Sequence, residues 1–217
     1  MRVYGDAPYS HGEAPIDTDY HLPFFTMRDF SQISYIVDSS DRLISLNQDW
    51  SSFAQNNGGE DLRPEAMSGR VLWDFIADEA TRELYAAVLA KVRSGAPTYL
   101  VLRCDAPASR RLIEMAVHKL ENGDVEFKTV LLAAKDRPFQ RLFDHSTPRT
   151  THHLMVCSWC DRVHVGGEEW VEVEEAMERL HLNDETELPQ VDPMVCMACF
   201  TKVMEIVSGP GLQPDAP

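Results

Sequence analysis

Residues 33–47, ISYIVDSSDRLISLN, decide the fold of the larger part of this chain. Two short apolar runs, 33–37 and 43–46, stand on either side of the polar segment 38–41. Isoleucine and valine favour strands, and the sequence Asp-Ser-Ser-Asp favours a turn. The stretch therefore predicts two antiparallel strands joined by a short turn.

Two helices are predicted after this hairpin. Asn47 stands where its side-chain oxygen can cap a helix that contains Trp50 and Phe53. Asp78 can cap a longer helix over about 79–93. The apolar residues of that helix recur at steps of three and four, which predicts one buried stripe: Leu84, Tyr85, Val88, Leu89 and Val92.

Three more strands are predicted over 98–104, 112–119 and 125–132, with turns at 105–107 and 121–124. In the middle run, Ile113, Met115 and Val117 alternate with more polar residues. Because successive side chains of a strand point to opposite faces, this alternation predicts one face in the core and one face nearer to water.

The order of two strands, helices and three antiparallel strands resembles that of a PAS domain. The resemblance covers about residues 30–134 and includes the block Gly69-Arg-Val-Leu-Trp-Asp-Phe-Ile76. It implies an α+β fold, with a PAS-like antiparallel five-stranded sheet and flanking helices. It also implies a sensor that binds a small ligand of unknown identity or mediates dimerisation.

Two Cys-x-x-Cys pairs, Cys157/Cys160 and Cys196/Cys199, are separated by 35 residues. Four thiolates can complete a tetrahedral shell that prefers zinc and leaves no position for water, so we expect a small C-terminal module with a structural zinc ion. The gap is longer than the about 15–20 residues usual between such pairs. Reduced thiols without metal, a redox dithiol and an iron–sulfur cluster are the alternatives.

The two parts together resemble a small bacterial group that pairs a PAS-like domain with a Cys-x-x-Cys tail. The residues that carry this resemblance, besides the cysteines, are Arg103-Cys-Asp105, Arg111 and 170–175. In related tails His-Gly commonly precedes the second pair, where this chain has Asp192-Pro-Met194. The difference removes a possible additional ligand and keeps all four sulfurs.

Arg103 and Arg111 are candidate ligand-binding residues, because two guanidinium groups could hold a carboxylate by paired hydrogen bonds. Pairing with Asp105 or Glu114 explains them equally well. Two other candidates have ordinary structural explanations, Cys104 as a packing residue and His118 as a structural histidine. The candidates near the first cysteine pair could replace a cysteine or bridge to another metal, but four sulfurs suffice without them: His152, His153 and His164.

Composition limits the partners. The chain of 217 residues has a formal net charge of −15, and residues 157–202 hold eleven acidic against three basic residues, a net of −8. A nucleic-acid partner is not expected, because phosphate binding needs a surplus of lysine and arginine. No apolar run is long enough for a membrane span, and five cysteines fit a reducing cytoplasm.

We therefore expect five segments: an N-terminal arm and flanking helix (1–29), a sensor domain (30–134), a linker with one helical turn (135–151), the metal module (152–208) and a disordered tail (209–217). In the module, a polar loop containing Pro189 and Pro193 is expected to lead to the second cysteine pair, and a closing helix is expected over about 200–207. The expected function is that of a bacterial cytoplasmic sensor or adaptor, not an enzyme, that acts through a protein partner or as a homodimer. The alternative is a thiol or metal redox switch acting through the four cysteines.

Overall fold

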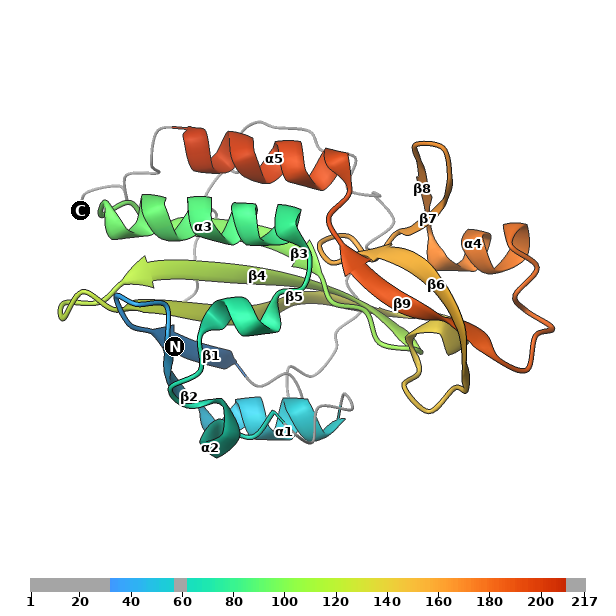
Figure 1. Cartoon of the computed structure of the whole chain (residues 1–217), viewed down its shortest axis with the longest axis horizontal. Coiled ribbons are helices and arrows are strands. Elements are labelled where there is room, and N and C mark those ends of the chain that lie inside the picture. The colour runs from blue at the N-terminus through green and yellow to red at the C-terminus, as the bar shows by residue number, and fades with distance from the viewer. Residues whose placement is uncertain (1–31, 57–61, 210–217) are drawn as a thin grey trace, which may run out of the picture.

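The computed structural model describes residues 32–56 and 62–209 (Figure 1). The expected N-terminal arm with its flanking helix, and nearly all of the expected C-terminal tail, lie outside the described residues. No helix in these two ranges is long and apolar enough to cross a membrane.

The larger part of the chain contains an antiparallel five-stranded sheet. Its strand order is β2-β1-β5-β4-β3, so the hairpin of β1 and β2 lies beside β5, the last of these five strands in sequence. This order, with the helices inserted between β2 and β3, confirms the expected α+β, PAS-like fold class. The strands are β1 (Ile33–Val37), β2 (Leu43–Leu46), β3 (Thr98–Arg103), β4 (Ser109–Lys119) and β5 (Val125–Asp136).

One face of this sheet forms the core. Leu100, Val117 and Phe127 are at most 1% exposed, and each lies on an adjacent strand of the sheet. The alternation predicted for β4 is observed, since Ile113, Met115 and Val117 are buried and their neighbours are partly exposed. β4 and β5 extend beyond their predicted ends and reach the smaller part of the molecule.

Both predicted helix caps are present. Asn47 Oδ1 accepts a hydrogen bond from the Trp50 amide at 3.1 Å, at the start of α1 (Gln48–Asn56). Asp78 Oδ2 accepts from the Thr81 amide at 2.8 Å, at the start of α3 (Glu79–Arg93). The apolar stripe of α3 is buried against the sheet. The short α2 (Pro64–Met67) and the 3-10 helix η1 (Leu72–Phe75) lie between these two helices in sequence.

The C-terminal part contains a second, four-stranded sheet, in the order β8-β7-β6-β9. β6 and β9 are parallel, whereas the other two pairs are antiparallel. After β5 the 3-10 helix η2 (Arg141–Phe143) forms the expected helical turn. The module's elements are β6 (Arg149–Cys157), β7 (Val163–Gly166), β8 (Glu169–Val171), α4 (Val173–Arg179), β9 (Leu188–Met194) and α5 (Met197–Ser208).

The prediction of a polar loop before the second cysteine pair is wrong, because this segment is strand β9. Pro189 and Pro193 suggested a loop because proline has no N–H to donate to a sheet. β9, however, lies at the edge of the described sheet and pairs there only with β6. In a strand, the backbone N–H groups of alternate residues point to the same side. Positions 189, 191 and 193 therefore lie on the side of β9 away from β6, where no ladder hydrogen bond is lost and proline is tolerated.

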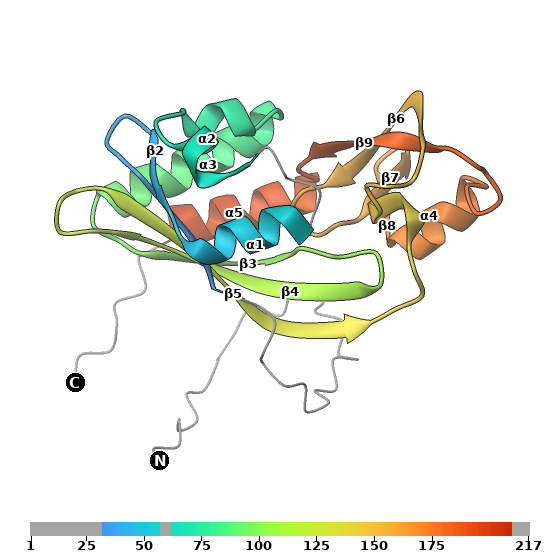
Figure 2. The ribbon, with the colours of Figure 1, turned by 90° about the horizontal axis from the view of Figure 1, so that it is seen from below.

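The two parts share one hydrophobic core. Cys157, Trp159 and Val203 of the C-terminal part belong to the same buried cluster as Leu84 and Phe127 of the larger part. α5 packs along α3, and α3 lies along the strands (Figure 1). Figure 2 shows the smaller sheet and α4 beyond one end of the five-stranded sheet, and only α5 returns over the larger part.

Candidate metal site and cavity

The four predicted cysteines lie together. Their sulfur atoms are all within 4.8 Å of one another, and the Sγ atoms of Cys160 and Cys196 are 3.9 Å apart. Four sulfurs at about 2.3 Å from a tetrahedral zinc ion lie about 3.8 Å from one another. The observed spacing fits one ion bound by four thiolates, so the residues can hold a metal of this kind.

Parallel pairing of β6 and β9 brings the two cysteine pairs together. β6 ends at Cys157 and β9 ends at Met194, and these two residues are partners in the register. The amide of Ser158 donates to the Met194 carbonyl at 2.7 Å, which joins the two turns directly. The second pair enters a helix, because Cys196 is the N-cap residue of α5 and Cys199 lies in its first turn.

Contacts among the four thiols lower the pKa of two of them and raise the pKa of the other two. Cys160 lowers the pKa of Cys157 to about 7, and Cys157 lowers the pKa of Cys196 below its usual range. The pKa values of Cys160 and Cys199 are raised, in each case mainly by a hydrogen bond with Cys157. Four thiolates this close repel one another, so a cation among them is needed for all four to ionise.

The cluster is partly shielded from solvent. Cys157 and Cys196 are buried, whereas Cys160 and Cys199 are partly exposed. Trp159, between the first two of these cysteines, is 5% exposed and packs into the shared core. The candidate metal site therefore lies at the junction between the two parts, with two sulfurs toward the core.

Arg103, one of the two candidate ligand-binding arginines, is engaged by protein carboxylates. Its guanidinium pairs with Asp105 and makes two hydrogen bonds to Glu172, at 2.7 and 3.0 Å. Arg111 donates from Nε to the Cys104 carbonyl at 2.5 Å. Arg103 thus pairs with Asp105, although the pair is buried and not on the surface, where such pairing was expected. Neither arginine is among the residues that line the cavity described below.

These ion pairs join the two parts of the molecule. The Asp105 side chain is 0% exposed and also accepts from Arg137 at 3.0 Å. From the module, Glu172 pairs with Arg103 and with Arg110, the latter at 3.3 Å, and Glu174 accepts from Arg110 at 2.8 Å. The Arg162–Glu172 pair at 3.1 Å lies within the module. No local pattern could identify Glu172 as a partner of Arg103, because the two residues are 69 positions apart in the chain.

The PAS-like part contains a cavity of about 160 Å³ that is partly open to solvent. Tyr35 and Tyr85 contribute its hydroxyl groups, and burial raises the pKa of both phenols above the ordinary range. The phenols therefore stay neutral and can donate hydrogen bonds at physiological pH. The remaining lining side chains are apolar or indole, namely Leu43, Trp50, Met67, Leu72, Phe75 and Ile76. Sequence reasoning did not identify this set, because it comes from six separate segments.

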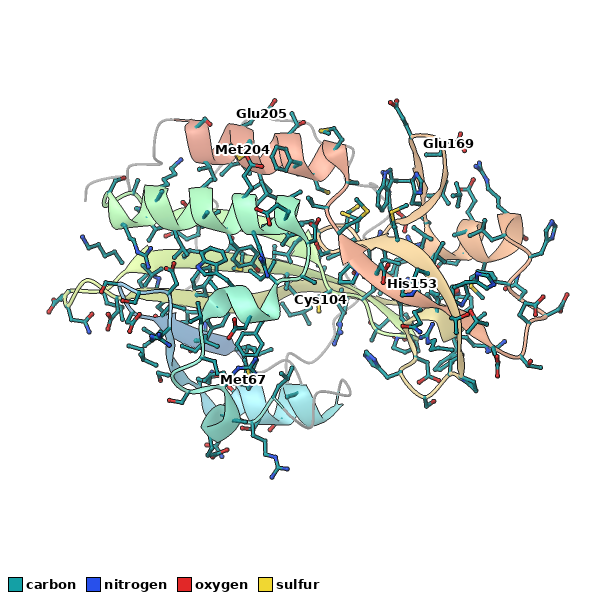
Figure 3. The ribbon with its side chains drawn as sticks, in the orientation of Figure 1. Met67, Cys104, His153, Glu169, Met204 and Glu205 are labelled. Carbon is teal, nitrogen blue, oxygen red and sulfur yellow. The ribbon has the colours of Figure 1, made fainter. Side chains whose placement is uncertain are left out.

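The other candidates lie outside the four-sulfur group. His153 Nδ1 is 2.8 Å from Asp192 Oδ1 on the exposed side of β6 and β9, and His118 pairs with Glu126 at 3.0 Å. His164 contacts the Gly167 carbonyl at 3.0 Å. Cys104 is half-buried, and burial raises the pKa of its thiol. Figure 3 shows His153 in the small module and Cys104 nearer to the junction.

No protein-family model and no curated protein matches the sequence. Among solved structures, a domain of an HTR-like protein from Haloarcula marismortui is similar to this chain. It is 16% identical with a TM-score of 0.33, over 47% of this chain and 98% of that one. A sensory box sensor histidine kinase from Vibrio cholerae is 12% identical with a TM-score of 0.35, over 48% of this chain and 83% of that one.

Proposed function

We propose that this chain is a signal-sensing or adaptor protein that binds a small ligand in its PAS-like part and holds a structural zinc ion at four cysteines. The observation that carries this proposal is the partly open cavity lined by Tyr35, Trp50, Met67 and Tyr85, among others. An apolar cavity with a few polar groups is the usual form of a small-molecule site.

The size of the cavity limits the ligand. A cavity of about 150 Å³ lined by apolar side chains holds one benzene molecule. With 160 Å³, this cavity suits a molecule built on a single ring. Because the phenols of Tyr35 and Tyr85 lie in its wall, we expect the ligand to carry one hydrogen-bond acceptor.

The zinc ion is proposed as a structural ion. Four sulfurs fill a tetrahedral shell and leave no position for a reacting water molecule, so we propose no enzyme activity for this site. We propose a bacterial cytoplasmic protein whose output runs through a protein partner or a homodimer. The acidic module, with a net charge of −8 over residues 157–202, supports a partner other than nucleic acid.

Ligand binding can be tested by thermal unfolding with a panel of single-ring compounds, starting with benzene and phenol. A ligand that binds only the native state raises Tm, and the rise grows with the logarithm of the ligand concentration above Kd. We expect at least one compound to raise the Tm of the wild type, and to have no effect on Met67→Trp, which fills the cavity. If no compound in the panel shifts the wild-type Tm at millimolar concentration, the proposed ligand class is wrong.

Metal identity needs a separate measurement. We expect elemental analysis of protein purified without added metal or chelator to give one zinc per chain and a colourless solution. If the protein instead contains iron and absorbs visible light, the four cysteines hold an iron–sulfur cluster and not zinc.

A redox switch is the second candidate, because Cys160 and Cys199 are partly exposed and Cys160 Sγ lies 3.9 Å from Cys196 Sγ. Thiolates near solvent are the ones that oxidants reach. Zinc release can be followed during titration with peroxide. Release at one or two equivalents would support the switch, whereas retention at a large excess would leave the site as a purely structural one.

A further inference from the structure

Helix α3 is the element through which the cavity and the metal site touch. It supplies Tyr85 to the cavity wall, and it contacts the C-terminal module at three places along its length. The contacts join its first turn to Ser158, its middle to Trp159 and its last turn to the C-terminal end of α5. The inference below rests on the proposed function of the cavity.

The first contact is at the N-terminus of α3. Asp78 Oδ2 accepts from the hydroxyl of Thr81 at 2.6 Å, and the Thr81 hydroxyl is 3.4 Å from that of Ser158. Ser158 lies between the two cysteines of the first pair. The cap of the helix therefore touches the turn that supplies two of the four sulfurs.

The second contact is aromatic. The Tyr85 ring is 6.1 Å from that of Trp159, which is also between Cys157 and Cys160, and 5.9 Å from that of Phe127. Phe127 in turn stacks on Tyr35 at 4.7 Å. The rings run without a break from the first cysteine pair to two residues of the cavity wall. Buried rings at such distances stabilise each other's positions.

The third contact is at the C-terminus of α3. Lys91 Nζ donates to the carbonyls of Ile206 at 2.6 Å and Gly209 at 3.1 Å, and so caps the last turn of α5. The helix that begins with the second cysteine pair is thereby fixed at both ends. Figure 3 shows Met204 on the side of α5 toward α3 and Glu205 on the opposite side. Met204 packs into the shared core.

We propose that metal binding at the four cysteines and ligand binding in the cavity are thermodynamically linked through α3. Metal binding fixes the turn 157–160, because ligation and local folding are coupled. The fixed turn holds Trp159 against Tyr85 and so holds one wall of the cavity in its binding position. By linkage, a ligand in the cavity raises the affinity for the metal by the same factor. Zinc is thus the effector that sets the sensitivity of the sensor.

The test measures zinc affinity, by competition with a chromophoric chelator, in variants of the full chain. Tyr85→Leu removes the ring, whereas Tyr85→Phe keeps the ring and removes only the hydroxyl. Val37→Ala is the control for general loss of core packing, since Val37 is fully buried and does not line the cavity. Circular dichroism checks that each variant is folded.

We expect Tyr85→Leu to lower the zinc affinity about 10-fold, within the usual range of coupling between two sites, and Tyr85→Phe and Val37→Ala to stay near the wild type. Lys91→Met, at a partly exposed position, serves as a second variant that keeps the core intact. It should lower the zinc affinity by a smaller factor. Zinc affinities equal to the wild type in both Tyr85→Leu and Lys91→Met, or an equal loss in Val37→Ala, would overturn the linkage.

This experiment needs no cavity ligand, so its outcome is independent of the ligand panel. A failed panel would overturn the proposed ligand class while the zinc affinities still decide whether Tyr85 acts on the metal site. If both succeed, zinc removal should lower the benzene or phenol affinity by the same factor by which a saturating concentration of that compound raises the zinc affinity, as reciprocity requires. An unchanged affinity would contradict the linkage.

Discussion

At the scale of single residues, Asp105 has the most demanding environment. Its side chain is completely buried between Arg103 and Arg137, whose side chains are 12% and 4% exposed. It also accepts a hydrogen bond from the Arg111 amide at 3.0 Å. A buried pair of this kind is most sensitive to the loss of one partner, because the remaining charge is left without compensation.

Asp105→Asn should therefore destabilise the protein strongly. We expect a loss of about 3–5 kcal/mol in the free energy of unfolding, measured by urea denaturation with zinc present. Arg179→Ala is the matched control, because Arg179 pairs with Glu169 and Glu175 on the surface. It should cost less than about 1 kcal/mol. If both variants lose the same free energy of unfolding, the buried Asp105 pairs contribute no more stability than a surface pair.

The five cysteines should fall into two classes. Cys199→Ser should abolish stoichiometric zinc binding and lower Tm, because it removes one of four ligands. Cys104→Ser should keep one zinc per chain, since Cys104 is outside the four-sulfur group. Elemental analysis and thermal unfolding of both variants check this. Loss of zinc in Cys104→Ser would mean that the ligand set is different.

At the scale of elements, the cap of α3 is a separate source of stability. Asp78→Ala removes the acceptor of the Thr81 amide, and N-cap replacements of this kind cost about 1 kcal/mol. We expect that loss in urea denaturation. Glu79→Ala is the control, because the Glu79 side chain is 92% exposed and only weakly paired, and should change stability by less than about 0.5 kcal/mol. If Asp78→Ala leaves the free energy of unfolding unchanged, Ser158 and the sheet hold the helix end without the cap.

The elements that the sequence could predict are those with local signals. The sequence predicts the hairpin at 33–46, α3 and the strands β3, β4 and β5 within a few residues, because the caps, turns and alternation that indicate them lie inside each segment. β9 was missed, since its prolines are tolerated only at an edge, and an edge is a property of the assembled sheet. Cys-x-x-Cys spacing similarly predicted the four-sulfur group, whereas the cavity lining and the partners of Arg103 depend on contacts between distant segments.

At the scale of the whole molecule, Glu172 links the module to the sheet, and its titration should show in the pH dependence of stability. Burial is the largest single influence on this carboxyl and works against its ionisation, but Arg103, Arg162 and Arg110 together outweigh burial and lower its pKa. A carboxyl whose pKa is lower in the folded state contributes stability above its unfolded pKa of about 4.3. That contribution is lost as the pH falls through the folded value.

Comparison of the wild type with Glu172→Gln isolates this effect. Above pH 5 the wild type should be more stable by about 1–3 kcal/mol, the usual worth of hydrogen bonds to a charged partner. The difference should shrink as the pH falls below about 4. Urea denaturation across pH 3–7 measures it. A difference that stays constant over this range would show that the charge of Glu172 does not hold the two parts together.

The prolines of β9 also affect how separate copies of this protein meet. An exposed strand edge has a row of free N–H and C=O groups, and another chain can pair with them as a further strand. Along the outer side of β9, positions 189 and 193 have no N–H to offer, and only Val191 between them does. Concentrated solutions should therefore resist strand-by-strand growth at this edge.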